Sequence, residues 1–359
     1  MGPISRLFYP PTRTPLKFIG RPARFTGPGH EISVSYVKAA DAKGEPMNVH
    51  CLPGYVSTMY LVEYVKRNQL LLLDCGSPSD VRRVKFYVED VMNEGRQDKL
   101  TLANSLKLAV TTHCHFDHSG GSEGYLRLGV PMAVPTDLEC SYVTVTSRIQ
   151  QFMEINFFAL IAHRMGRRRE DPFVFSKGLL GPHWTWSPKT SLVLGDGQSL
   201  PHGFEDWVAV KIPGHTSHMI GLFHSPTGIF YASDFTVKLK RGFFAPRPVN
   251  YLWAYQHTWK RLRGLQVSCL LLPHGGIVDV AKEHGSWEAI LDEIERHMSK
   301  DTNSATAGKE ASYQVNWGQL FGKLLDIPGV EKRDFTPEAL DNGPVPKRQD
   351  PPQPACVVR

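Results

Sequence analysis

One stretch constrains this chain more than any other: residues 111–121, TTHCHFDHSGG, place three histidines and an aspartate within six positions. The apolar run Leu106–Val110 immediately before it predicts a buried strand, so the stretch begins where that strand ends. A lone His-x-His pair would be weak evidence, because single histidines often sit in cores or on surfaces. This spacing instead gathers four metal-competent side chains in one loop: His113, His115, Asp117 and His118.

The local geometry of this loop separates ligands from packing residues. Alternation along an extended chain turns the first two histidines to one side and Cys114 to the other, so we expect Cys114 to pack rather than to bind metal. Ser119 and the two glycines after it predict a capping residue and a flexible turn into a helix. Asp117 and His118 would then lie at the N-terminus of that helix.

Four further apolar runs also end in residues of the types that bind metals, histidine and aspartate. WVAVKIPGH closes on a Pro-Gly turn and a histidine, and VSCLLLPHGG closes on a turn that carries another. MIGLFHSPTGIFYASD is typical of a hairpin that turns at residues 225–228 and ends in an aspartate, and QLLLLDCGS also ends in one. Ligand sites form at the carboxyl ends of sheet strands. We therefore expect these side chains to meet: Asp74, His215, Asp234 and His274.

This ordered set resembles the ligand pattern of the metallo-β-lactamase superfamily of metallohydrolases, over about residues 30–290. The resemblance implies an α/β fold, a four-layer αβ/βα sandwich of two mixed sheets with outer helices. It also implies two adjacent metals, the first held by His113, His115 and His215, and the second by Asp117, His118 and His274. Asp234 would bridge the metals, and Asp74 would steady the ligand loops without binding a metal.

The implied chemistry is metal-dependent hydrolysis by a hydroxide that bridges two divalent ions. Two aspartates would take part in catalysis: Asp234 by bridging the metals, and Asp117 by orienting the nucleophile and carrying a proton. Zinc is the preferred metal, but imidazole and carboxylate ligands also accept iron and manganese.

The substrate is less constrained than the metals. The loop HFDHSGG is similar to that of acyl-homoserine lactonases and glyoxalase II thioesterases, which favours a small-molecule acyl substrate, a thioester or a lactone. Two departures limit the comparisons: Val237 stands where the lactonases carry a tyrosine, and Arg241–Phe244 match the glutathione contact of glyoxalase II only loosely. Three basic side chains after the bridging aspartate either hold an anionic substrate group or line an edge strand: Lys238, Lys240 and Arg241.

Two other functions stay open at the level of sequence. A phosphodiesterase or nuclease would need a long basic groove, whereas the net charge is only +6 and the densest basic cluster, Arg164 with Arg167–Arg169, is typical of a solvated helix end or of a single anion contact. A non-catalytic metal-binding scaffold would keep the fold without turnover, but such relatives usually lose ligands, and all seven are present. Nucleic acid and membranes are not expected partners, and oligomeric state is not predicted.

Composition shifts divide the 359 residues into three parts. Residues 1–29 form a basic arm, expected to be irregular because of its prolines, with a mitochondrial presequence as the alternative. Residues 30–300 form the hydrolase domain, with a helical, aromatic-rich insertion over about 136–190 that is either a lid over an apolar pocket or a helix covering core. Residues 301–359 are predicted to be a linker, a short helix and a disordered tail.

The six cysteines form no C-x-x-C pair, and a chain of this size needs no disulfides, so we expect reduced thiols and a cytoplasmic protein. No stretch approaches the roughly 20 uninterrupted apolar residues that a membrane helix requires.

Overall fold

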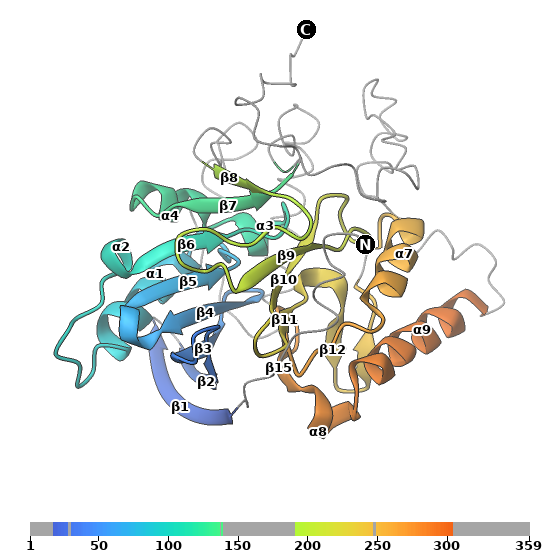
Figure 1. Ribbon diagram of the computed structural model, residues 1–359, viewed down its shortest axis with the longest axis horizontal. Helices are drawn as coiled ribbons and strands as arrows, with labels where there is room; N and C mark the ends of the chain where they lie inside the picture. Colours follow the sequence, from blue (N-terminus) through green and yellow to red (C-terminus); the bar gives the residue numbers. More distant parts are fainter. Residues whose placement is uncertain (1–16, 28–29, 137, 139–190, 247–248, 304–359) are drawn as a thin grey trace, which may run out of the picture.

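The computed structural model describes residues 17–27, 30–136, 138, 191–246 and 249–303. Within them, an eight-stranded sheet and a five-stranded sheet pack face to face, and helices cover their outer faces (Figure 1). This arrangement confirms the predicted α/β sandwich with two mixed sheets. The predicted insertion over 136–190 lies almost entirely outside the described residues, and so do the linker, short helix and tail predicted over 301–359, except that residues 301–303 end a helix instead of beginning a linker.

The first sheet runs in strand order β1 to β8. Its strands are β1 (Lys17–Gly27), β2 (His30–Ala40), β3 (Pro46–Pro53), β4 (Thr58–Tyr64), β5 (Gln69–Leu73), β6 (Leu106–Val110), β7 (Met132–Pro135) and β8 (Ser191–Leu194). Neighbours from β1 to β5 pair antiparallel, and those from β5 to β8 pair parallel. The sheet is therefore mixed, and β5 and β6 end at the same edge.

The second sheet has the order β15-β14-β11-β10-β9. Its strands are β9 (Trp207–Lys211), β10 (Ile220–His224), β11 (Ile229–Tyr231), β14 (Cys269–Leu272) and β15 (Gly276–Asp279). Because β10 is antiparallel to both β9 and β11, and β11 is parallel to β14, three strands point the same way: β9, β11 and β14. A separate hairpin joins β12 (Val237–Leu239) to β13 (Gly242–Phe244).

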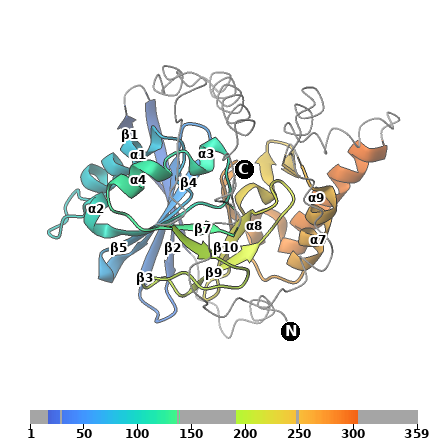
Figure 2. The same cartoon turned by 90° about the horizontal axis from the view of Figure 1, so that it is seen from above.

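Helices lie on opposite outer faces of the sandwich (Figure 2). The first sheet is covered by α1 (Asp80–Phe86), which continues into η3 (Tyr87–Val91), and by α2 (Leu102–Ser105) and α4 (Ser122–Arg127). The second is covered by α7 (Leu252–Leu262), α8 (Val280–His284) and α9 (Trp287–Asn303). Short turns of helix complete the described elements: η2 (Val65–Arg67), α3 (Phe116–Ser119) and η7 (Ser233–Phe235).

Strand β5 shows why these sequences form a sandwich. Its leucines are all buried, and they alternate between two cores: Leu71 and Leu73 face the second sheet, whereas Leu70 and Leu72 pack beneath α1 and α4. A strand buried on both faces has no need of polar alternation, so its sequence is a continuous apolar run. The same rule accounts for the all-apolar strand β14 in the second sheet.

The irregular arm predicted over residues 1–29 is wrong for its second part. Residues Lys17–Gly27 form β1, an edge strand that pairs antiparallel with β2. The register shifts between Gly20 and Ala23, so Arg21 and Pro22 fall in a bulge, where a missing main-chain N–H costs the ladder nothing. Proline content excluded a helix here but not an edge strand.

Four of the six cysteines lie in the described part of the chain, and all four are buried: Cys51, Cys75, Cys114 and Cys269. Cys75 and Cys269 are free thiols there, as the composition predicted. In the described part of the chain, no helix combines the length and apolar character that spanning a bilayer requires.

Candidate metal centre

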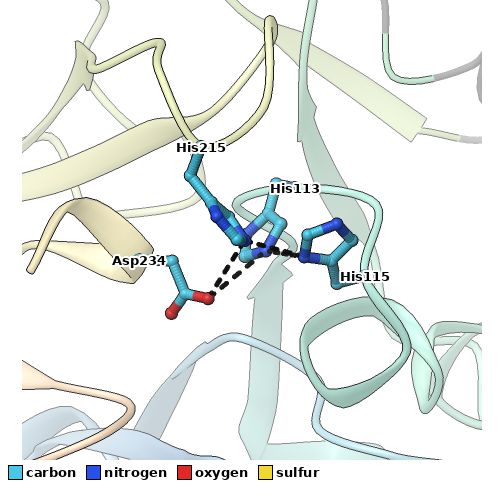
Figure 3. A group of neighbouring side chains, drawn as sticks. All are labelled: His113, His115, His215 and Asp234. Carbon is cyan, nitrogen blue, oxygen red and sulfur yellow. Dashed lines mark hydrogen bonds and ion pairs between the residues drawn. The ribbon is translucent and has the colours of Figure 1, made fainter. Parts of the chain in front are cut away.

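The predicted ligands and Asp74 meet at one edge of the sandwich because five strands end there. His113 follows β6 and Asp74 follows β5 in the first sheet. His215, Asp234 and His274 follow the three parallel strands of the second sheet, β9, β11 and β14. The close-up in Figure 3 shows the two histidines from the first sheet pointing toward the histidine and aspartate from the second.

The first ligand group contains three histidines and one carboxylate oxygen. His115 Nδ1 lies 3.1 Å from His113 Nε2 and 2.9 Å from His215 Nε2. Asp234 Oδ2 lies 3.3 Å from His215 Nε2 and 3.9 Å from His113 Nε2. All four donor atoms are within 4.8 Å of one another, the spacing of ligands around one metal ion.

The second ligand group uses the other oxygen of the same aspartate. His274 Nε2 lies 3.3 Å from Asp117 Oδ2, and His118 Nε2 lies 3.5 Å from it. Asp234 Oδ1 is 3.4 Å from His118 Nε2 and 3.7 Å from His274 Nε2. The carboxylate of Asp234 thus divides its two oxygens between the two groups.

Three atoms of the second group show that it fits a cation. Asp117 Oδ2, His118 Nε2 and Asp234 Oδ1 are buried and have no hydrogen-bond partner. Leaving a buried polar atom unpaired costs about 1–3 kcal/mol, and more when it is charged. Two carboxylate oxygens and an imidazole nitrogen aimed at one point are satisfied together by a divalent ion.

The electrostatics of the centre separate its histidines into two kinds. Burial lowers the pKa of His113 well below its usual value and that of His115 to about 4, which keeps both imidazoles neutral and able to donate lone pairs. Burial also acts to lower the pKa of His118, but the carboxylates of Asp117 and Asp234 outweigh it and raise that pKa. The carboxylates therefore give His118 a higher affinity for protons than His113 or His115 has.

Asp74 orients the His118 ring through Nδ1, the nitrogen that faces away from the other candidate ligands. Its Oδ2 accepts a hydrogen bond from His118 Nδ1 over 2.6 Å and another from Thr112 Oγ1, while its Oδ1 accepts from the Thr112 main-chain N–H. Tyr231 also donates its hydroxyl to Asp74 Oδ2. With Nδ1 committed as a donor, the Nε2 atom of His118 is the one that faces the ligands. Asp74 has a left-handed backbone, with φ of 62°.

A family model agrees with this geometry. The model of the metallo-beta-lactamase superfamily matches residues 52–274. The chain belongs to this superfamily. The matched segment contains all seven predicted ligands and Asp74.

Solved structures named for the same superfamily are similar to this chain at low sequence identity. A metallo-beta-lactamase family protein from Thermus thermophilus has 17% identity and a TM-score of 0.46, over 81% of this chain and 82% of that chain. An archaeal superfamily protein from Sulfolobus tokodaii has 14% identity and a TM-score of 0.45, over 77% and 93%. A subclass B3 metallo-beta-lactamase from a soil metagenome library has 16% identity and a TM-score of 0.45, over 73% of this chain and 95% of that chain. No curated protein matches the chain.

The histidine loop of this superfamily member differs in detail from the sequence prediction. Helix α3 begins after His115, so Ser119 closes the helix instead of capping its start, and its hydroxyl donates to the carbonyls of Cys114 and His115. Gly120 and Gly121 have right-handed backbones. They are needed for close packing instead, since a Cβ at Gly121 would lie 2.2 Å from the Cys75 carbonyl oxygen.

Cys114 packs, as alternation predicted. It lies in a small apolar cluster with Val134 and Leu138 and belongs to neither group of candidate ligands.

The three basic residues after Asp234 lie on the β12–β13 hairpin. Lys238 pairs its ammonium with Glu283, while its main-chain N–H donates to the His274 carbonyl over 2.9 Å. Lys240 and Arg241 are exposed at the turn of the β12–β13 hairpin. Their role in binding an anionic substrate stays a prediction.

Sequence reasoning missed two polar side chains that hold the ligand loops. Ser57 donates its hydroxyl to the main-chain carbonyl of Asp117, and Asn250 donates its amide to that of His215 over 2.7 Å. Both contacts join residues far apart in the chain, and neither residue stands in a recognisable motif. Only Thr112, beside His113, could have been found by its position.

Proposed function

We propose that the chain is a dinuclear metal-dependent hydrolase. The observation that carries this proposal is the division of the Asp234 carboxylate, with one oxygen in each of two ligand groups. A single catalytic zinc uses about three protein ligands, so seven convergent donors support two ions better than one. Five of the seven residues donate imidazole nitrogen, which suits zinc, with iron and manganese as alternatives.

The residues of the centre have separable tasks in such an enzyme. Two divalent ions held there supply Lewis acidity toward a substrate oxygen and activate water near neutral pH. Asp117 is buried beside His118 and His274; burial acts to raise its pKa, but these two imidazoles outweigh burial and lower it. It is therefore an ionised carboxylate that can orient a nucleophile and accept a proton. Asp74 keeps His118 in the tautomer that presents Nε2.

The substrate class that we propose is a thioester or lactone of a small acyl compound. Its support is the loop HFDHSGG, which is similar to that of lactonases and glyoxalase II thioesterases in the same superfamily. Superfamily folds host many substrates, so this part of the proposal depends on the loop rather than on the fold. A phosphodiester is the competing substrate, because the same centre could polarise a phosphoryl oxygen.

Two measurements test the proposal. Elemental analysis of the purified chain should give about two metals per monomer, and a stoichiometry near one that does not rise on adding metal excludes the dinuclear centre. Matched panels of ester, thioester, lactone and phosphodiester substrates should then give the highest kcat/KM for a thioester or lactone, with activity lost in chelator. Far more efficient turnover of bis(p-nitrophenyl) phosphate or RNA would show that the acyl assignment is wrong.

A further inference from the structure

The ligand residues of the two groups are held in place by two different parts of the fold. We propose that the turn Gly54–Thr58 sets the metal affinity of the second group, and that the segment Asn250–Thr258, which contains most of α7, sets that of the first. Neither segment contributes a ligand. The inference rests on the proposed two-metal function and assigns positioning residues to each half of the centre.

The turn Gly54–Thr58 joins β3 to β4 in the first sheet and contacts the main chain at Asp117 and just before His274, two candidate ligands that belong only to the second group. The Ser57 hydroxyl donates to the main-chain carbonyl of Asp117. The next residue, Thr58, donates its main-chain N–H over 2.8 Å to the carbonyl of Pro273, which immediately precedes His274. One turn therefore spans the gap between the two sheets and fixes two ligand residues relative to each other.

A buried carboxylate makes this turn rigid. Asp80 is fully buried, and its Oδ1 accepts the main-chain N–H of Tyr55 over 2.9 Å, while its Oδ2 accepts that of Ser77 over 2.8 Å. The turn is also too tight for a side chain at Gly54, where a Cβ would lie 2.6 Å from the Ser57 carbonyl oxygen. The position of the Ser57 hydroxyl is thus determined by packing that does not involve the metal ligands.

The segment Asn250–Thr258 holds the loop of His215, which belongs only to the first group. Asn250 donates its side-chain amide to the His215 carbonyl over 2.7 Å. Two more bonds secure the preceding residues: the Tyr251 N–H donates to the Gly214 carbonyl, and the Thr258 hydroxyl donates to the Pro213 carbonyl, each over 2.9 Å. The loop is pressed against α7 so closely that a Cβ at residue 214 would clash with that helix.

The energetic consequence follows from how outer partners act on metal ligands. A metal ion gains affinity when its ligands are already oriented, and removing a hydrogen bond that orients a ligand side chain costs about 10–100-fold in affinity. Ser57 and Asn250 bond to the main chain of the ligand residue, so we expect the lower end, about tenfold. Because each contact reaches ligands of one group, the loss should be confined to that group.

The experiment uses two backgrounds in which one ligand group is incomplete. His115→Ala leaves the second group intact, and His274→Ala leaves the first intact. Zinc affinity is measured by dialysis against chelator-buffered zinc followed by elemental analysis. Ser57→Ala should weaken zinc binding about tenfold in the His115→Ala background and less than about threefold in the His274→Ala background. Asn250→Ala should show the reverse, so each variant is the control for the other.

Further variants keep the test decisive if an alanine variant does not fold. Ser57→Thr retains the hydroxyl and should preserve affinity, whereas Asp80→Asn should act through the turn on the second group alone. Thr258→Ala should act through the Pro213 loop on the first group alone. Equal losses in both backgrounds, or no loss in either, overturn the assignment. A wild-type chain that binds one zinc overturns the two-metal function instead, and the single-group backgrounds still report on the two segments.

Discussion

The substitution Asp74→Asn isolates the contribution of one buried carboxylate to the second ligand group. Asp74 acts on the second group because its carboxylate accepts a hydrogen bond from His118 Nδ1 and so orients that imidazole. Its left-handed backbone is kept, because asparagine adopts positive φ at least as readily as aspartate. The shape of the side chain is also kept. The charge is removed, and an NH₂ donor replaces one oxygen, which in the wild-type chain accepts from His118, Thr112 and Tyr231.

The orientation of the new amide decides the size of the effect. The Thr112 main-chain N–H points at Oδ1 and cannot reverse, so the amide oxygen must take that position. The amide NH₂ then occupies the position of Oδ2 and faces His118 Nδ1, which must become an acceptor. The proton of His118 moves to Nε2, the ligand atom. Metal binding then requires the proton back on Nδ1, where it faces the amide NH₂ instead of forming the charge-assisted hydrogen bond that the wild-type carboxylate accepts. Losing that bond costs about 1.5–3 kcal/mol, equivalent to a loss of about 10–150-fold in zinc affinity.

The measurement is zinc affinity of Asp74→Asn in the His115→Ala background, where the second group is the intact one. We expect the dissociation constant to rise by about two orders of magnitude. Asp206→Asn is the matched control, since Asp206 is also a largely buried carboxylate that accepts from a tyrosine and a histidine but lies outside the centre. It should lower the melting temperature without changing zinc affinity. Unchanged affinity in Asp74→Asn would refute the role of Asp74 in selecting the tautomer.

Three further predictions concern the centre and its loop. His115→Ala should strip one metal while Asp234→Asn weakens both, because a neutral amide bridges two cations poorly; full metal content in Asp234→Asn contradicts the bridge. On acidification the second group should lose its metal first, because protons compete with the metal for His118. Burial acts to lower the pKa of His118, but neighbouring carboxylates outweigh it and raise that pKa, whereas burial lowers the pKa of His115 to about 4. Elemental analysis after dialysis at stepped pH reveals the order, and the reverse order contradicts it. Gly121→Ala should lower the free energy of unfolding in urea by about 2–3 kcal/mol. Gly195→Ala is the control and should cost less than about 1 kcal/mol, because a Cβ there would lie 3.6 Å from the end of a flexible side chain. Equal losses would exclude the packing role of Gly121.

The positions of the candidate ligands were predictable because each is marked by a local pattern. The apolar run before His113, the hairpin before Asp234 and the turn that carries His274 all appear in the structure where the sequence places them. Strand burial and turn formation depend on neighbouring residues, so a short window contains the evidence. The two mixed sheets also followed from the resemblance of this ordered set to a known superfamily.

Other features depended on which segments meet in space. Edge strand β1 contains Pro22, and only its pairing with β2 shows that the proline falls in a bulge. The role of the two glycines after Ser119 was misjudged for a similar reason, because their packing partner is the Cys75 loop rather than a local turn.

The sequence by itself determined which side chains could bind metal and at which strand ends they stand. Only the tertiary structure decided what holds them there: the Ser57 hydroxyl on Asp117, the Asn250 amide on His215 and the tautomer imposed on His118. The physical reason is that these hydrogen bonds join residues distant in sequence, and two of them end on main-chain carbonyls, which every residue possesses. Such contacts leave no periodicity and no residue preference to read, so they become visible when the chain is folded.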